Sequence, residues 1–181
     1  NYGDNMKSKL FKFELLGFVF CCILGTLSHF FYDWSGQNII VGMFCPVNES
    51  VWEHLKLIYT PYFLWAIVEY FILGEKKINL FFSKFTGAIS GMLTILFIHY
   101  TYTGATGNES MIADIISFFA GVAAAFIISY TIIKNTKYKG MASEIISLLL
   151  LIVTGGLFIL FTFSPPLIPM FEDAVTKTYG I

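Results

Sequence analysis

Three histidines and several acidic residues stand near the ends of long apolar segments, where their side chains could form a metal site. Imidazole nitrogens and carboxylate oxygens are ligands that zinc and related divalent ions take in proteins. A catalytic metal site holds the ion with three protein ligands and keeps one position for a water molecule, whose pKa the metal lowers. The residues that we predict as metal ligands are His29, His54, His99 and Asp114.

Further polar residues surround these predicted ligands. A carboxylate beside a metal can act as a general base or can orient a ligand imidazole, and the candidates for catalytic roles are Glu53, Ser50 and Asp33. Glu49 and Glu109 complete the predicted pocket. No close-spaced pair such as H-E-x-x-H is present, so the site requires separate helices to meet. The alternative is that each histidine lies at a membrane interface and bonds a neighbouring helix.

The composition indicates an integral membrane protein. Of its 181 residues, 56% are apolar and 13% are charged, whereas a soluble domain carries about 25% charged residues. Twenty Phe, 10 Tyr and 3 Trp exceed what one small core can hide, because a chain of this size leaves about a third of its unfolded surface exposed. A net charge of −1 offers no basic surface for nucleic acid. We therefore expect the lipid bilayer, and no nucleic acid, as a partner.

Five apolar segments reach the length of about 20 residues that crosses a bilayer. The predicted spans are residues 10–32, 51–73, 80–102, 111–133 and 144–163, and an outer tail follows at 164–181. The apolar segment Ile39–Cys45 is too short to cross and is predicted to be re-entrant or interfacial. The sequence thus predicts an all-α fold, a polytopic bundle of about five transmembrane helices that forms a single domain over residues 1–181.

The lysines alternate between successive connections of this predicted bundle. They precede the first span and occur around the second and fourth connections, whereas residues 33–48 and 103–110 contain none. Positively charged loops favour the cytoplasm, which predicts a cytoplasmic N-terminus and an outer C-terminus. Lys56 and Lys177 are the two exceptions on the predicted outer side.

The predicted ligands share one depth in the membrane. Each lies about one helical turn from the outer end of its span, or about 5–9 Å below the boundary at about 1.5 Å per residue. Ionisable groups inside a bilayer are costly and tend to face protein or water. The inner end has fewer such groups, and we expect them to pair with lysines at the inner surface. They are Glu14, Glu69, Glu75 and Glu144.

Two similar triplets open the second and fourth spans, Asn48-Glu49-Ser50 and Asn108-Glu109-Ser110. Asn and Ser are favoured at helix N-termini, so helix capping accounts for both triplets. A parallel duplication of a two-helix hairpin is the other interpretation, and it would make His54 and Asp114 equivalent.

The segments Ser28–Trp34 and Pro46–His54, together with Ile98-His99-Tyr100, resemble a family of small uncharacterised bacterial integral membrane proteins. The resemblance covers most of the chain and implies a bacterial cytoplasmic membrane as its location. Residues 50–54, Ser-Val-Trp-Glu-His, are also similar to the Ser-x-x-x-His element of the alkaline ceramidases and progestin/adiponectin receptors. Those proteins are seven-helix membrane hydrolases whose zinc is held by three histidines with help from a Ser and an Asp. The likeness implies that His54 is a ligand and Ser50 a site residue, although this chain has five spans and no histidine in the fifth.

We expect an outward-facing pocket that binds a divalent metal ion, zinc foremost, and hydrolyses an amide or ester of a lipid-like substrate from the outer leaflet. The alternative is a transporter or a membrane protein that binds a cation or small solute without catalysis, since short re-entrant segments commonly line transport sites. A structural membrane subunit is a further alternative.

Overall fold

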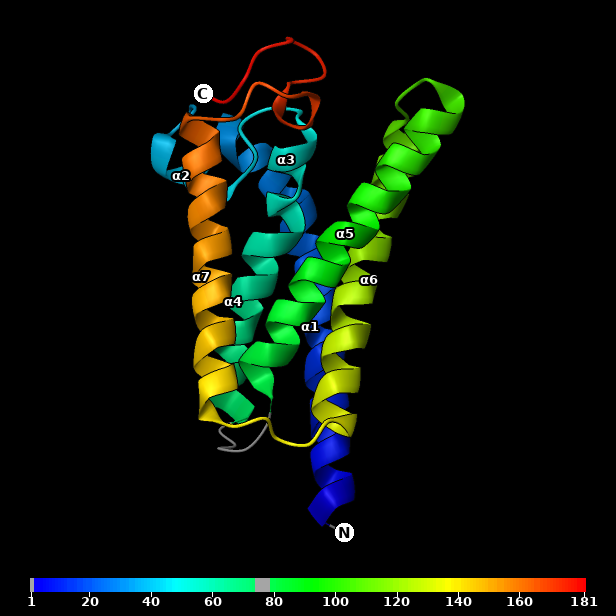
Figure 1. Cartoon of the computed structure of the whole chain (residues 1–181), viewed down its shortest axis with the longest axis vertical. Helices are drawn as coiled ribbons and strands as arrows, with labels where there is room; N and C mark the ends of the chain where they lie inside the picture. The colour runs from blue at the N-terminus through cyan, green and yellow to red at the C-terminus, as the bar shows by residue number, and fades with distance from the viewer. Residues whose placement is uncertain (1, 74–78) are drawn as a thin grey trace.

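Long apolar helices make up the bundle (Figure 1). The computed structural model describes residues 2–73 and 79–181. Its helices are α1 (Tyr2–Trp34), α2 (Ile39–Phe44), α3 (Val51–His54), α4 (Lys56–Leu73), α5 (Leu80–Thr106), α6 (Met111–Asn135), α7 (Met141–Phe163) and the 3-10 helix η1 (Pro169–Phe171). In the described part, five segments are long and apolar enough to cross a membrane, with α3 and α4 counting together as one. The predicted all-α bundle is confirmed.

The short helices α2 and α3 lie at the end of the bundle that carries the C-terminus (Figure 1). The side chain of Asn38 begins α2 by accepting a hydrogen bond from the Ile40 amide at 2.9 Å. Ser50 caps α3 by accepting from the Glu53 amide at 3.3 Å, and Ser110 caps α6 in the same way, from Ala113 at 3.5 Å. These contacts confirm helix capping as the role of the serine in both triplets.

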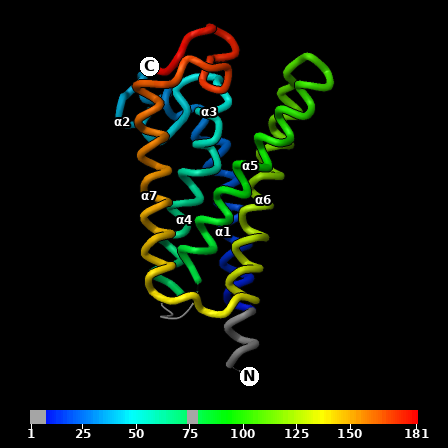
Figure 2. Tube along the Cα trace, viewed as in Figure 1, coloured from blue at the N-terminus to red at the C-terminus, as the bar shows by residue number. Residues whose placement is uncertain are grey.

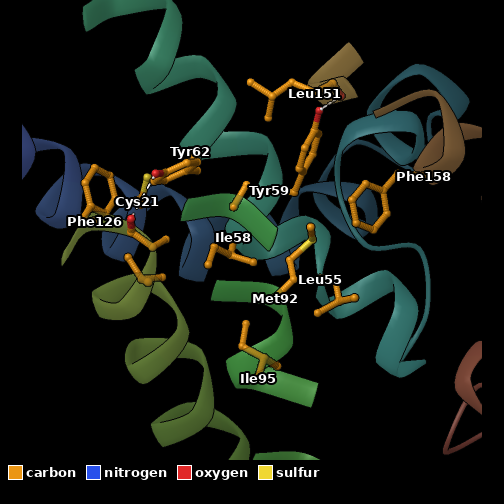
Figure 3. Close-up of a cluster of buried hydrophobic side chains, with 13 residues drawn as sticks. Cys21, Leu55, Ile58, Tyr59, Tyr62, Met92, Ile95, Phe126, Leu151 and Phe158 are labelled. Atoms are coloured by element: carbon orange, nitrogen blue, oxygen red, sulfur yellow. Dashed lines mark hydrogen bonds between the residues drawn. The ribbon is translucent and has the colours of Figure 1, made fainter. Parts of the chain in front are cut away.

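Aromatic side chains of α4 form the centre of the core (Figure 3). The Tyr59 hydroxyl donates a hydrogen bond to the Leu151 carbonyl of α7 at 2.5 Å. The Tyr62 hydroxyl donates to the Ala125 carbonyl of α6 at 3.2 Å. Each ring buries apolar surface while its hydroxyl keeps a partner, so α4 is tied to the helices on both of its sides.

The helices α5 and α6 pack against each other through glycine. A Cβ atom added at Gly91 would lie 2.7 Å from the Gly121 carbonyl oxygen, and one added at Gly121 would lie 2.8 Å from that of Gly91. Small residues let membrane helices approach this closely. Toward their connecting loop the pair leans away from α3, α7 and the C-terminal tail (Figure 2).

A buried ion pair fastens the C-terminal end of the bundle. The Lys56 ammonium donates to Glu53 at 2.7 Å, to the Gly42 carbonyl of α2 at 2.8 Å and to the Thr162 hydroxyl of α7 at 2.5 Å. The second carboxylate oxygen of Glu53 lies 2.9 Å from the same hydroxyl. Both charged side chains are at most 2% exposed. Lys56, which interrupted the alternation of lysines, is therefore a core residue and not a loop residue.

At the opposite end, the expected pairing of glutamates with lysine is found for Glu14 and Glu69, but inside the bundle and not at its surface. Glu14 and Glu69 both contact Lys84, and all three side chains are buried between helices, because Lys84 lies one turn inside α5 and not in a connection. Glu144 accepts hydrogen bonds from two backbone amides in the first turn of α5, where helix amides lack an internal partner. Glu75 lies outside the described residues.

We predict that Lys56→Met lowers the free energy of unfolding by about 3–5 kcal/mol, since it leaves Glu53 as a buried charge without its partner. The double variant Glu53→Gln/Lys56→Met removes both charges and is expected to recover most of this loss. Reversible unfolding of the purified protein in mixed detergent micelles measures both values. Equal destabilisation in the single and double variants would contradict the prediction.

Candidate metal centre

Two histidines and one glutamate from separate elements converge at the C-terminal end of the bundle. The Nε2 atoms of His29 and His54 are 3.2 Å apart. The Oε2 atom of Glu49 lies 3.5 Å from the His29 Nε2 atom and 3.2 Å from that of His54. Among the described residues, these three form the one group of three or more His, Cys, Asp or Glu side chains whose ligand atoms lie within 4.8 Å of one another.

Local structure places each of these side chains. His29 lies in the last part of α1, and His54 is the final residue of α3. Glu49 directly precedes the Ser50 cap, and its own amide donates to Asp173 in the C-terminal tail at 3.2 Å. Burial raises the pKa of Asp173. Hydrogen bonds from backbone amides, first that of Thr176 and then that of Glu49, outweigh the effect of burial and hold this pKa below its usual value. The tail thus presents a charged acceptor to the loop that carries Glu49.

The site is partly exposed and contains an ionised carboxylate. The side chains of His29, His54 and Glu49 are 32%, 31% and 44% exposed, so an ion can reach them from solvent. Hydrogen bonds from His29 and then from His54 hold the pKa of Glu49 well below its usual range. Glu49 is therefore ionised at neutral pH. A small pocket adjoins the site, lined by His29, Tyr32, Asp33, Pro46, Val47, Asn48 and Glu49.

The protonation states of the two rings decide which of these contacts are hydrogen bonds. A neutral imidazole carries one N–H group, and the other ring nitrogen is an acceptor. If both Nε2 atoms carry protons, the two N–H groups face each other at 3.2 Å. If one does, it donates to the other ring nitrogen or to Glu49, and if neither does, three acceptors face one another. A cation between the three atoms would be attractive to all of them.

The candidate catalytic residues differ in their access to this site. Asp33 is exposed and lines the same pocket as His29. Glu53 points away from it, into the buried pair with Lys56, where its Oε2 atom also accepts from the Val47 amide at 3.1 Å. Ser50 is 1% exposed and serves as the cap of α3. Of the three, Asp33 alone faces the pocket, because the other two are engaged in holding the fold.

The other two predicted ligands form a separate pair. The Nδ1 atom of His99 lies 2.9 Å from Asp114 Oδ1, to which the Tyr102 hydroxyl also donates at 2.7 Å. These contacts join α5 to α6 near their loop, where Glu109 is exposed. The predicted four-ligand set is thus divided, because α5 and α6 lean away from α1 and α3 at this level (Figure 1).

Sequence reasoning included Glu49 in the pocket but not among the ligands. The feature that could have identified Glu49 is its position directly before a helix cap and four residues after Cys45, which is buried. A residue at such a place lies where the chain turns back into the bundle, at the level of the last turn of α1. Whether its carboxylate meets the two imidazoles therefore depends on how the loop folds, which helix periodicity does not report.

Comparisons with known proteins place the chain in a family without assigning it an activity. No curated protein and no solved structure matches it. A family profile does match, and it covers residues 3–181, nearly the whole chain. The chain belongs to this family, a family of unknown function (DUF6512).

Proposed function

We propose that the protein binds a divalent metal ion through His29, Glu49 and His54, at one end of a membrane-spanning bundle. The observation that carries the proposal is the size of the triangle that the three ligand atoms form, 3.2, 3.2 and 3.5 Å on its sides. Ligands about 2.0–2.2 Å from a tetrahedral zinc ion stand about 3.3–3.6 Å from one another. The three atoms already have nearly this spacing, so binding would require little rearrangement.

Zinc is the ion that fits this donor set best. Two imidazoles and one carboxylate are the protein ligands of several zinc hydrolases, which keep the fourth position for water. A zinc ion would neutralise Glu49 and would lower the pKa of a bound water molecule. Binding of a cation without catalysis would use the same three ligands and would require no further residue.

Hydrolysis of a lipid-like ester or amide is the second candidate function. It is favoured by Asp33, an exposed carboxylate in the pocket beside His29 and Glu49. A carboxylate in this place could accept a proton from a metal-bound water molecule. Glu53 is engaged with Lys56 at 2.7 Å, so we assign the role of base to Asp33 alone. Substrate would reach the pocket from the surrounding leaflet.

We further propose that this end of the bundle faces the outside of a bacterial cytoplasmic membrane. At the other end, the connection between α6 and α7 carries Lys137 and Lys139, with Lys134 in the last turn of α6. The loops next to the candidate metal site contain no lysine. Since Lys56 is buried within the bundle, Lys177 is the one exposed lysine at this end among the described residues.

We predict that the purified protein binds one zinc ion per chain. His29→Ala and His54→Ala should each weaken zinc binding by more than about 100-fold, because loss of a residue that only hydrogen-bonds a ligand already costs about 10–100-fold in metal affinity. Competition with a zinc-chelating dye, with metal analysis of the washed protein, measures the affinity. The matched control His99→Ala is expected to bind as the wild type does. A loss of binding in the control equal to that of His54→Ala would refute the assignment.

We predict that Asp33→Asn keeps the bound zinc and lowers hydrolysis of a lipid ester or N-acyl amide in micelles by about 10²–10⁴-fold, the usual size of a general-base contribution. Parallel assays of metal content and product release test this. If the zinc-loaded wild type releases no product from either substrate class, hydrolysis is excluded and the metal site stands as a binding site.

A further inference from the structure

A second cluster of charged side chains lies inside the bundle, toward its N-terminal end. The Lys84 ammonium of α5 is 2.9 Å from Glu14 Oε2 of α1 and 2.5 Å from Glu69 Oε2 of α4. The side chains are 0%, 4% and 0% exposed in the order Lys84, Glu14 and Glu69. Lys84 is the fifth residue of α5, which places it about 6 Å inside the helix end.

The two glutamates are unequally supplied with hydrogen-bond donors. Glu14 accepts from Lys84 and, on its other oxygen, from the Ser129 hydroxyl of α6 at 2.7 Å. Glu69 contacts Lys84 through Oε2 alone. Within residues 2–73 and 79–181, neither of its two buried carboxylate oxygens has a hydrogen-bond partner, and the contact of Oε2 with Lys84 is an ion pair alone. The carboxylate that is least stabilised as an anion is therefore that of Glu69.

Among the side chains that the structure describes, no other group around the cluster compensates its charge. The Tyr62 hydroxyl of α4 donates its hydrogen bond to the Ala125 carbonyl and not to the cluster. Ser83 of α5 donates to the Leu80 carbonyl, and Cys21 of α1 is a buried free thiol. The ring faces of Tyr62 and Phe126 lie 5.3 and 5.1 Å from the ammonium and add to its stabilisation. One ammonium thus faces two carboxylates, which leaves one negative charge in an apolar interior.

We propose that Glu69 is a proton-binding site within the membrane-spanning core. An isolated buried charge costs far more than a neutral polar group, and such groups neutralise instead. A proton on Glu69 balances the cluster, since Lys84 then pairs with Glu14 alone. Ionisable residues buried among transmembrane helices commonly belong to proton relays. The proposal does not depend on the metal site, which lies at the other end of the bundle (Figure 1).

Infrared difference spectroscopy of the full chain in lipid bilayers tests the proposal. At neutral pH, in sodium-free buffer and in buffer with sodium, we expect the C=O stretching band of one protonated carboxyl per chain, shifted by exchange into D2O. Glu69→Gln should remove this band and fold normally, because the amide resembles the neutral carboxyl in shape. The exposed-tail variant Glu172→Gln is the matched control and should keep the band.

A second variant separates the proposal from a folding defect. In Glu14→Gln, the ammonium of Lys84 has only Glu69 to neutralise, so Glu69 should lose its proton and the band should again disappear. Persistence of the full band in Glu69→Gln would overturn the assignment. Loss of the wild-type band on addition of sodium would overturn it in favour of a metal-cation site.

Discussion

The buried pair of Glu53 and Lys56 is the constraint on which the C-terminal end of the molecule depends. An unpaired charge in an apolar bundle is strongly unfavourable, so each partner must keep the other in place. The pair also forms hydrogen bonds with the chain around it: Lys56 donates to the Gly42 and Cys45 carbonyls at 2.8 and 3.4 Å, and Glu53 accepts from the Val47 amide. The loop between α2 and α3 is thereby fixed, and with it Glu49. A residue that sequence reasoning selects as a catalytic base instead holds the site together.

The charges of the two polar clusters are balanced in different ways. The site of His29, Glu49 and His54 is about one-third exposed, so water and ions share in its charge balance. The cluster around Lys84 is sealed between α1, α4 and α5, so its balance must come from protons within the protein. The first arrangement suits an exchangeable ion, and the second suits a group whose protonation is governed by its immediate partners.

The sequence predicts the helices well, but it predicts only in part which polar side chains come into contact. Length and hydropathy locate the five spans, because a bilayer demands about 20 apolar residues in each. Position along a helix gives the depth of His29, His54, His99 and Asp114, but not the lean of α5 and α6 that separates the last two. Lys84 lies within the predicted span 80–102, and a lysine inside a span was a usable signal of a buried charge cluster. Its two partners lie 70 and 15 residues away in sequence, so their identity follows only from helix packing.

The most direct test of the central claim is the zinc K-edge X-ray absorption spectrum of the zinc-loaded protein. We expect a first shell of nitrogen and oxygen atoms, with the outer-shell scattering of two imidazole rings, those of His29 and His54. Sulfur in the first shell, which would come from the free thiols of Cys21, Cys22 or Cys45, or a shell of oxygen without imidazole scattering, would contradict it.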